Sequence, residues 1–257
     1  MKKYTFLQIS AAFLLSGTVI AAPTPVDLTG WAAEGSGGTW TVQSGNDSVF
    51  QSVNSAYPTV FHNGQNSQNL ALSGEITVQE NGGDNDFIGF VLGYNSGDLT
   101  NASANYILID WKQGDQSPGV DGLAISRVTG ALQPGGGTHL SNDAWNHTGV
   151  VTELARATNF GSTGWSDSTT YGFDLIFTST AIQVSVNDIV ELSINGVFDN
   201  GSFGFYNFSQ DNVLYSGLEE RVAPPIGAVP IPAAVFMFAP AFLGLMGFRR
   251  KAKNSFA

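Results

Sequence analysis

Three consecutive polar residues that could bind a metal stand at the start of an apolar segment. Asp84, Asn85 and Asp86 run without a break into residues 87–94, which are typical of a buried strand. Carboxylate and amide oxygens are the hard ligands that Ca²⁺ takes, and a strand end would hold them in place. The sequence therefore predicts a Ca²⁺ site at Asp84, Asn85 and Asp86. The alternative is that both carboxylates cap a turn and face water.

Residues that could support catalysis do not form a recognisable pattern. Glycoside hydrolases need two carboxylates at a fixed separation, but the Glu-x-Asp-x-x-Glu pattern is absent and the spacing of Glu75 and Glu80 does not place them on one strand face. No nucleophile-elbow motif accompanies the neighbouring polar residues His139, Ser141, Asp143 and His147. We therefore expect a protein that is not an enzyme, in which His147 is a structural hydrogen-bonding residue beside Trp145.

The elements that must position these residues are β-strands. Residues 87–94 and 106–113 are rich in β-branched and aromatic side chains, which indicates two neighbouring core strands. Between residues 170 and 186 apolar side chains occupy alternate positions on both sides of residues 178–180, the pattern of an antiparallel hairpin. About a dozen short strands at this spacing predict an all-β sandwich. The other strands are expected at residues 40–42, 49–50, 75–80, 123–128, 189–194, 203–208 and 213–218.

For three further segments the sequence predicts a turn or leaves the secondary structure open. Residues 61–64, which include His62, indicate a turn, and residues 133–138 indicate an exposed, mobile turn because they are rich in Gly and Pro. Residues 150–156 fit either a short helix or a strand, and propensity does not decide between them.

The charge distribution excludes one class of partner. All 21 acidic residues lie between Asp27 and Glu220, and residues 22–222 contain only four basic residues, so this predicted exported domain carries a net charge of −17 although the whole chain carries −11. Nucleic acid is excluded as a partner because phosphate binding relies on Lys and Arg. The chain has no cysteine, so a hydrophobic core must hold the domain together without disulfides.

The N-terminus has the form of a secretory signal peptide. A basic start is followed by an apolar stretch and small residues, which predicts a signal over residues 1–21 with cleavage after Ala21. The alternative is an N-terminal anchor helix. We expect an exported protein.

The C-terminus changes composition after Arg221. Residues 223–228 form a Pro-rich linker, and residues 229–253 contain a Pro motif, an apolar run over 233–248 and a basic end. The apolar run is shorter than the roughly 20 residues that span a bilayer comfortably, and the basic end would stay cytoplasmic. The motif is Val229, Pro230, Ile231, Pro232 and Ala233, and the basic end includes Arg249, Arg250 and Lys251.

This C-terminal segment resembles the PEP-CTERM sorting signal in its Val-Pro-Leu-Pro-Ala variant, with Ile231 in place of Leu. The resemblance implies that the short hydrophobic helix holds the chain in the inner membrane until an exosortase-type enzyme cleaves at the Pro motif. Such signals imply the cell surface or extracellular matrix of a Gram-negative bacterium. A permanent C-terminal anchor is the alternative.

The region between the two termini resembles the C-terminal lectin-like domain of thrombospondins. The resemblance covers nearly all of residues 22–222. It implies a jelly-roll, concanavalin-like β-sandwich that is secreted and calcium-binding and takes part in matrix and adhesion, and it favours a strand over residues 150–156. The matching segments are 84–94, 111–113, 129–130, 139–140, 145–149, 164–165 and 208–212.

Two functions of different classes fit these observations. The first is a non-catalytic adhesion or matrix protein that binds extracellular polysaccharide or a surface protein, with Ca²⁺ shaping the binding edge. The second is a structural component of an exopolysaccharide or biofilm matrix without a specific ligand. Exposed Trp145 or Trp165 would favour the first, because sugar rings stack on aromatic faces, whereas a core position for both would favour the second.

Overall fold

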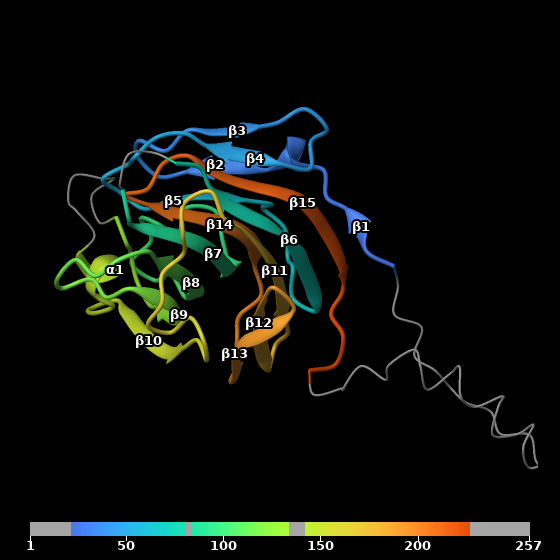
Figure 1. The fold of residues 1–257 in the computed structure, drawn as a ribbon. Helices are drawn as coiled ribbons and strands as arrows, with labels where there is room; N and C mark the ends of the chain where they lie inside the picture. Colours follow the sequence, from blue (N-terminus) through green and yellow to red (C-terminus); the bar gives the residue numbers. More distant parts are fainter. Residues whose placement is uncertain (1–21, 81–83, 134–141, 227–257) are drawn as a thin grey trace, which may run out of the picture. The chain divides into compact units, whose positions relative to one another are not determined.

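The domain is a sandwich of two antiparallel sheets (Figure 1). The computed structural model describes residues 22–80, 84–133 and 142–226. In the first sheet the strand order is β13-β12-β11-β6-β15-β4-β3, with β1 also paired to β15. In the second sheet the order is β10-β9-β8-β7-β14-β5-β2. The predicted all-β sandwich is therefore confirmed.

The strands of each sheet have the following bounds. The first sheet contains β1 (Thr24–Pro25), β3 (Trp40–Val42), β4 (Val49–Gln51), β6 (Leu70–Val78), β11 (Thr170–Phe177), β12 (Ala181–Val186), β13 (Ile189–Asn195) and β15 (Val213–Val222). The second contains β2 (Ala32–Glu34), β5 (Thr59–His62), β7 (Phe87–Tyr94), β8 (Tyr106–Lys112), β9 (Gly122–Val128), β10 (Val151–Arg156) and β14 (Ser202–Phe208). The short helices are η1 (Leu28–Gly30) and α1 (Asn142–Asn146).

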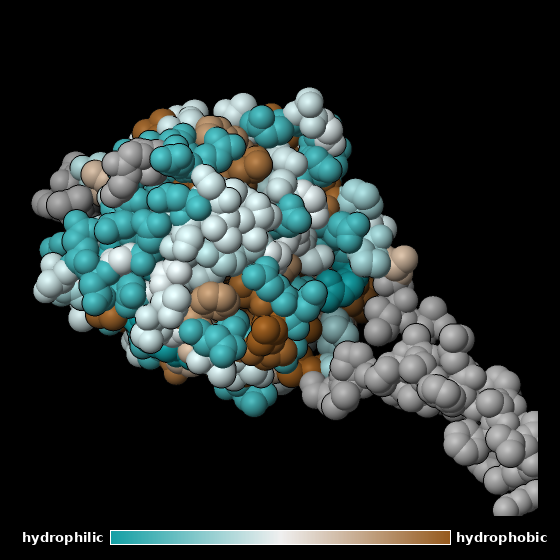
Figure 2. Space-filling view, viewed as in Figure 1, coloured by the Kyte–Doolittle hydropathy of each residue, from teal (hydrophilic) through white to brown (hydrophobic). Residues whose placement is uncertain are grey.

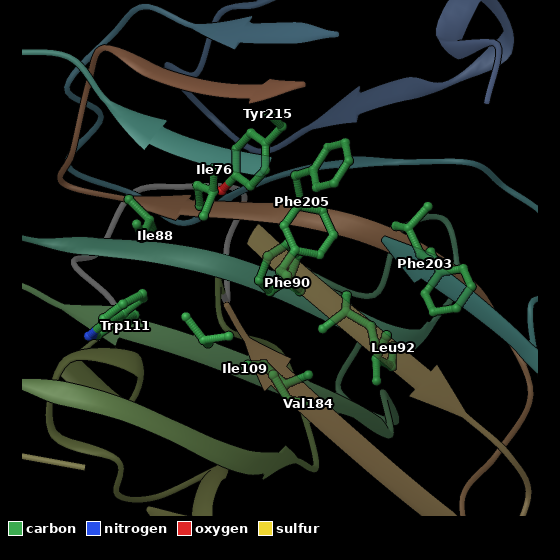
Figure 3. Close-up of a cluster of buried hydrophobic side chains, with 14 of the residues drawn as sticks. Ile76, Ile88, Phe90, Leu92, Ile109, Trp111, Val184, Phe203, Phe205 and Tyr215 are labelled. Atoms are coloured by element: carbon green, nitrogen blue, oxygen red, sulfur yellow. The ribbon is translucent and has the colours of Figure 1, made fainter. Parts of the chain in front are cut away.

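The main hydrophobic core lies between the two sheets. Side chains from both layers point into this space (Figure 3). The predicted hairpin is present as β11 and β12, in which Phe173 pairs with Val186 and Leu175 with Val184, so the alternating apolar side chains share the core face. The labelled core residues in Figure 3 are Ile76, Val184 and Tyr215 of the first sheet and Ile88, Phe90, Leu92, Ile109, Trp111, Phe203 and Phe205 of the second.

A second, smaller core covers the outer face of the second sheet. Leu99 and Leu132, from loops beyond the strands, and Ala144 of α1 are buried in the same cluster as outward side chains of β7 and β8. Both faces of β7 and β8 are thus buried, which explains why these strands appear in the sequence as continuous apolar runs rather than as alternating patterns.

Each sheet has identifiable edge strands. In the first sheet the edges are β13 on one side and β3 with the short β1 on the other, and in the second sheet they are β10 and β2. On β13, Ile189 and Val190 are 55 % and 45 % exposed. Figure 2 shows hydrophobic atoms in the region of β12 and β13, among surfaces that are mostly hydrophilic or neutral.

Several strand predictions are confirmed, and others need correction. β7 and β8 pair as neighbours, and residues 151–156 form strand β10. The predicted turn at His62 is wrong, because His62 ends β5 and is buried. The strand expected at residues 75–80 begins at Leu70 instead and ends at Val78. The helix α1 was not predicted.

Predictions for both termini and for the Gly-rich turn fall outside the described residues. These include the signal sequence with Ala21, residues 134–138 of the Gly-rich turn, and the C-terminal segment from residue 227. The C-terminal segment contains the motif Val229, Pro230, Ile231, Pro232 and Ala233 and the basic residues Arg249, Arg250 and Lys251. Among the residues that the structure describes, no helix is long and apolar enough to cross a membrane.

Candidate calcium site

The predicted acidic residues lie where β7 begins beside the end of β8. The register pairs Phe87 with Lys112, which brings the Lys112 side chain next to Asp86. The Lys112 ammonium donates to Asp86 Oδ1 over 2.6 Å and to the Asn85 carbonyl over 3.0 Å. Both side chains of this ion pair are buried, Lys112 at 0 % and Asp86 at 4 % exposure. Asp86 therefore has a fixed cationic partner within the domain.

Aromatic rings surround the same ammonium. Lys112 Nζ lies 5.2 Å from the Phe87 ring centroid and 4.7 Å from that of Trp145. These contacts add cation–π attraction to the ion pair. A fully buried lysine is rare unless it is paired, and here the carboxylate and the rings satisfy it together.

Asp84 stands in contact with Asp86 in a crowded acidic environment. Burial raises the pKa of Asp84 to about 6, with further contributions from the charge of Asp86, a hydrogen bond to it and the charge of Asp211. The amide of Asn54 donates to Asp84 Oδ2 over 2.5 Å. In the absence of a cation, the Asp84 carboxylate is thus held near other negative charges at an energetic cost.

The main chain of Asp86 is fixed by two buried side chains. Its N–H donates to Gln210 Oε1 over 2.9 Å, and its carbonyl accepts from the indole N–H of Trp165 over 3.1 Å. The same indole reaches the carbonyl of Trp111 over 3.1 Å. Trp165 therefore fixes, from inside the sandwich, the acidic corner formed by Asp84, Asn85 and Asp86.

Asn85 occupies a different position from its two neighbours. Its carbonyl accepts from the N–H groups of Gln113 and Gly114 and from Lys112. Its side-chain amide lies against Gly114, where an added Cβ would be 3.1 Å from Asn85 Nδ2. The structure thus uses Asn85 to join the start of β7 to the end of β8, and its role as a metal ligand stays a prediction.

Asp84 and Asp86 meet some of the requirements of a Ca²⁺ site. Asp84 and Asp86 are hard oxygen donors in mutual contact, and the Asp211 charge acts on Asp84, so the corner has the charge that a divalent cation favours. Lys112 already neutralises part of Asp86. Within residues 22–80, 84–133 and 142–226, no group of three or more His, Cys, Asp or Glu side chains has metal-binding geometry. Asp84 and Asp86 alone are not a complete ligand set, and their role as Ca²⁺ ligands stays a prediction.

His147 connects the segment after α1 to the second sheet. Its Nε2 lies 2.9 Å from Asp110 Oδ2 and its Nδ1 lies 2.9 Å from Glu153 Oε2. The charge of Asp110 is the largest of the effects that raise the pKa of His147 to about 9. Both ring nitrogens are thus occupied, which agrees with a structural role next to Trp145.

The two tryptophans that were expected to report on ligand binding differ in burial. Trp165 is in the core with 2 % exposure, whereas Trp145 is partly buried and lines an open groove. Trp165 therefore offers no surface for a sugar ring.

Sequence reasoning missed the most important partners of the acidic corner. Lys112, Gln210 and Asn54 contact Asp86 or Asp84 from positions far away in the chain. One signal for Lys112 was available, since a single lysine at the end of a continuous apolar strand needs a buried partner. Gln210 lies in the matching segment 208–212, but no local signal assigns Gln210 or Asn54 to contacts with Asp86 or Asp84.

Comparison with known proteins decides the family. The family model "Thrombospondin C-terminal region" matches residues 36–223. The chain belongs to this family. Human thrombospondin-3 is 27 % identical over 164 residues, and thrombospondin-4 of Bos taurus is 28 % identical over 160 residues. Each match covers 54 % of this chain but only 16 % and 15 % of the relative, respectively. The chain therefore corresponds to a small part of the thrombospondins it matches.

Solved structures agree with the fold of this thrombospondin C-terminal family member. A carbohydrate-binding module from Bacillus subtilis has a TM-score of 0.51 at 12 % identity, covering 75 % of this chain and 96 % of the module. A Bacillus subtilis protein described as having a galectin-like fold has a TM-score of 0.52 at 10 % identity, covering 79 % and 96 %. At these identities the likeness supports the lectin-like jelly-roll fold alone.

Proposed function

We propose that this chain is an exported, non-catalytic calcium-binding adhesion or matrix protein that binds a glycan or a protein partner. The observation that carries the proposal is the contact between the carboxylates of Asp84 and Asp86 at the start of β7, in a domain of the thrombospondin C-terminal family. Like charges in contact oppose each other, and a bound divalent cation offsets that repulsion. Ca²⁺ held there would tie the β6–β7 connection to the sandwich.

The hydrogen bonds of His147 support the proposal that the protein is not an enzyme. Both ring nitrogens of His147 are bonded to carboxylates, so neither nitrogen is free to take a proton from a nucleophile. Asp110 and Glu153 lie on opposite sides of this imidazole and serve to hold it.

Export and processing belong to the same proposal. Removal of the predicted signal after Ala21 would release the domain across the inner membrane, and an exosortase-type enzyme would cleave within residues 229–233. The mature domain would then act at the surface or in the extracellular matrix of a Gram-negative bacterium, with extracellular polysaccharide or a surface protein as partner.

Thermal unfolding of the full chain tests the calcium part of the proposal. We expect about 2.7 kcal/mol of stabilisation when free Ca²⁺ is 100 times its dissociation constant, relative to EDTA. Mg²⁺ at equal concentration serves as the cation control. Asp84→Asn should abolish the stabilisation, whereas Glu219→Gln, which removes an exposed carboxylate on β15, should retain it. An equal Ca²⁺ response in both variants would refute the site.

A structural matrix component without a specific ligand is the second candidate. One half of the condition set for it is met, because Trp165 lies in the core with its indole N–H committed to the carbonyls of Asp86 and Trp111, whereas Trp145 is only partly buried. A domain without Ca²⁺ stabilisation and without a bound polysaccharide would support this second function.

A further inference from the structure

An open groove beside Trp145 has the features of a ligand site. Its volume is about 370 Å³, and it lies at the outer side of the second sheet, between α1, β10 and the loop after β8. The lining residues that could contact a ligand are Pro118, Val120, Trp145, Asn146, Glu153 and Arg156.

One wall of the groove is apolar. Val120 is 52 % exposed, and Pro118 and the partly buried Trp145 continue the wall. The indole is fixed because its N–H donates to the Gln116 carbonyl over 3.3 Å and because Gly119 packs against it, so that an added Cβ would be 2.7 Å from Trp145 Nε1. An exposed apolar wall next to a fixed indole suits the C–H face of a sugar ring.

The opposite wall is polar and held in place before a ligand arrives. Arg156 donates to both carboxylate oxygens of Glu153 and to the carbonyls of Asp121 and Gly161. Glu153 is also bonded to His147. A wall that is already ordered loses little conformational entropy when a ligand binds.

Asn146 contributes a polar side chain to the groove. Within the described part of the chain, no hydrogen bond engages the side-chain amide of Asn146. An amide offers both donors and an acceptor, which matches the hydroxyl groups of a saccharide.

The charges near the groove balance one another. His147 and Arg156 face the carboxylates of Asp110 and Glu153, so the polar wall has no excess of positive charge. The surrounding domain is strongly acidic. An anionic polysaccharide would be repelled by that field, whereas a neutral one would not.

From these contacts we infer that the groove lined by Trp145, Asn146 and Arg156 binds a neutral oligosaccharide. This inference rests on the proposed function and names the class of ligand and the surface that takes it. The apolar wall packs on the sugar ring, and Asn146 with the Glu153–Arg156 pair bonds its hydroxyl groups.

Affinity electrophoresis of the full chain in gels that contain a polysaccharide tests the inference. The probes are three neutral polysaccharides, β-glucan, mannan and galactan, and one anionic polysaccharide, polygalacturonate. We expect retardation by at least one neutral probe and none by polygalacturonate. The absence of retardation by all neutral probes, or stronger retardation by polygalacturonate, overturns the inference.

Three variants test whether the groove residues form the binding surface. Asn146→Ala should weaken retention at least fivefold without a change in thermal midpoint, and Trp145→Leu should weaken it further. Asn195→Ala, which removes an exposed amide on β13, is the matched control and should bind like the wild type. Retention that is unchanged in Asn146→Ala overturns the assignment, even if Trp145→Leu proves unstable.

A parallel measurement separates the two proposals. If the wild type shows Ca²⁺ stabilisation but no neutral polysaccharide retards it, the groove inference fails and the calcium part of the proposed function stands. If Ca²⁺ stabilisation is absent while a neutral polysaccharide retards the wild type and this retardation depends on Asn146, the groove inference stands and the calcium site fails.

Discussion

Replacing Asp84 with Asn should stabilise the calcium-free domain while abolishing its response to calcium. Asn keeps the size of the side chain and can still accept the hydrogen bond from Asn54 through its carbonyl oxygen. It removes the negative charge that lies near Asp86 and Asp211. Because that charge is unfavourable without a cation, its loss should raise the free energy of unfolding measured in EDTA.

The magnitude follows from the acid–base behaviour of Asp84. The rise in its pKa from 3.8 to about 6 corresponds to about 3 kcal/mol if the whole effect is counted. The side chain is partly open to solvent, so screening reduces this to about 1 kcal/mol at pH 7. For a domain of this size, about 1 kcal/mol raises the unfolding midpoint by roughly 2–4 °C.

Because the pKa of Asp84 is raised in the folded state, the stability of the domain should depend on pH. The folded state of the wild type keeps the Asp84 proton to higher pH than the unfolded state does, so the stabilising contribution of the protonated group is lost as pH rises from about 4 to about 6. Denaturant unfolding in EDTA across this range should show that loss in the wild type but not in Asp84→Asn. A variant that is less stable than the wild type at pH 7, or one that retains the full Ca²⁺ stabilisation, would refute the reasoning.

Other contacts give further predictions. Lys112→Met should cost about 3–5 kcal/mol in urea unfolding because Asp86 loses its buried cation, and adding Asp86→Leu should restore part of the loss; an additive double variant would contradict this. His147 stabilises the fold fully below its ordinary pKa of 6.5, and this contribution, about 3 kcal/mol, should disappear as pH rises through about 9. His147→Ala should show no such loss between pH 6.5 and 9.5, and parallel profiles would refute the role. Gly89→Ala should destabilise the domain by about 3 kcal/mol or more because the new Cβ collides with the Ile109 carbonyl; an unchanged urea midpoint would argue against that packing.

Much of the sheet architecture could be predicted because local patterns carry it. The alternation in β11 and β12 identifies a hairpin with one buried face, and the structure shows that register. The continuous apolar runs of β7 and β8 indicate burial on both faces, which the second core confirms. His62 was misplaced because Asn63 and Gly64 after it are turn residues, whereas its pairing in β5 depends on β14 and β2.

The environment of the candidate site was less accessible to sequence reasoning. The sequence predicts ligation by the carboxylates of Asp84 and Asp86 and by the amide oxygen of Asn85, but the contacts of these residues come from distant segments. Lys112 reaches Asp86 only because β7 and β8 are in one register, and that pairing makes Asp86 a buried ion-pair partner while Asp84 remains half-buried. Local sequence indicates that a charge is present, whereas the fold determines what that charge contacts.

The last strand of the sandwich has a mechanical consequence. β15 is paired with β6 on one side and with β4 and β1 on the other, so it lies within its sheet rather than at an edge. A pulling force applied to the chain after Val222 and directed along this strand would load the hydrogen bonds on both sides together. A domain tethered through its C-terminal end would thus resist tension by shear, whereas an edge strand would be peeled away one bond at a time.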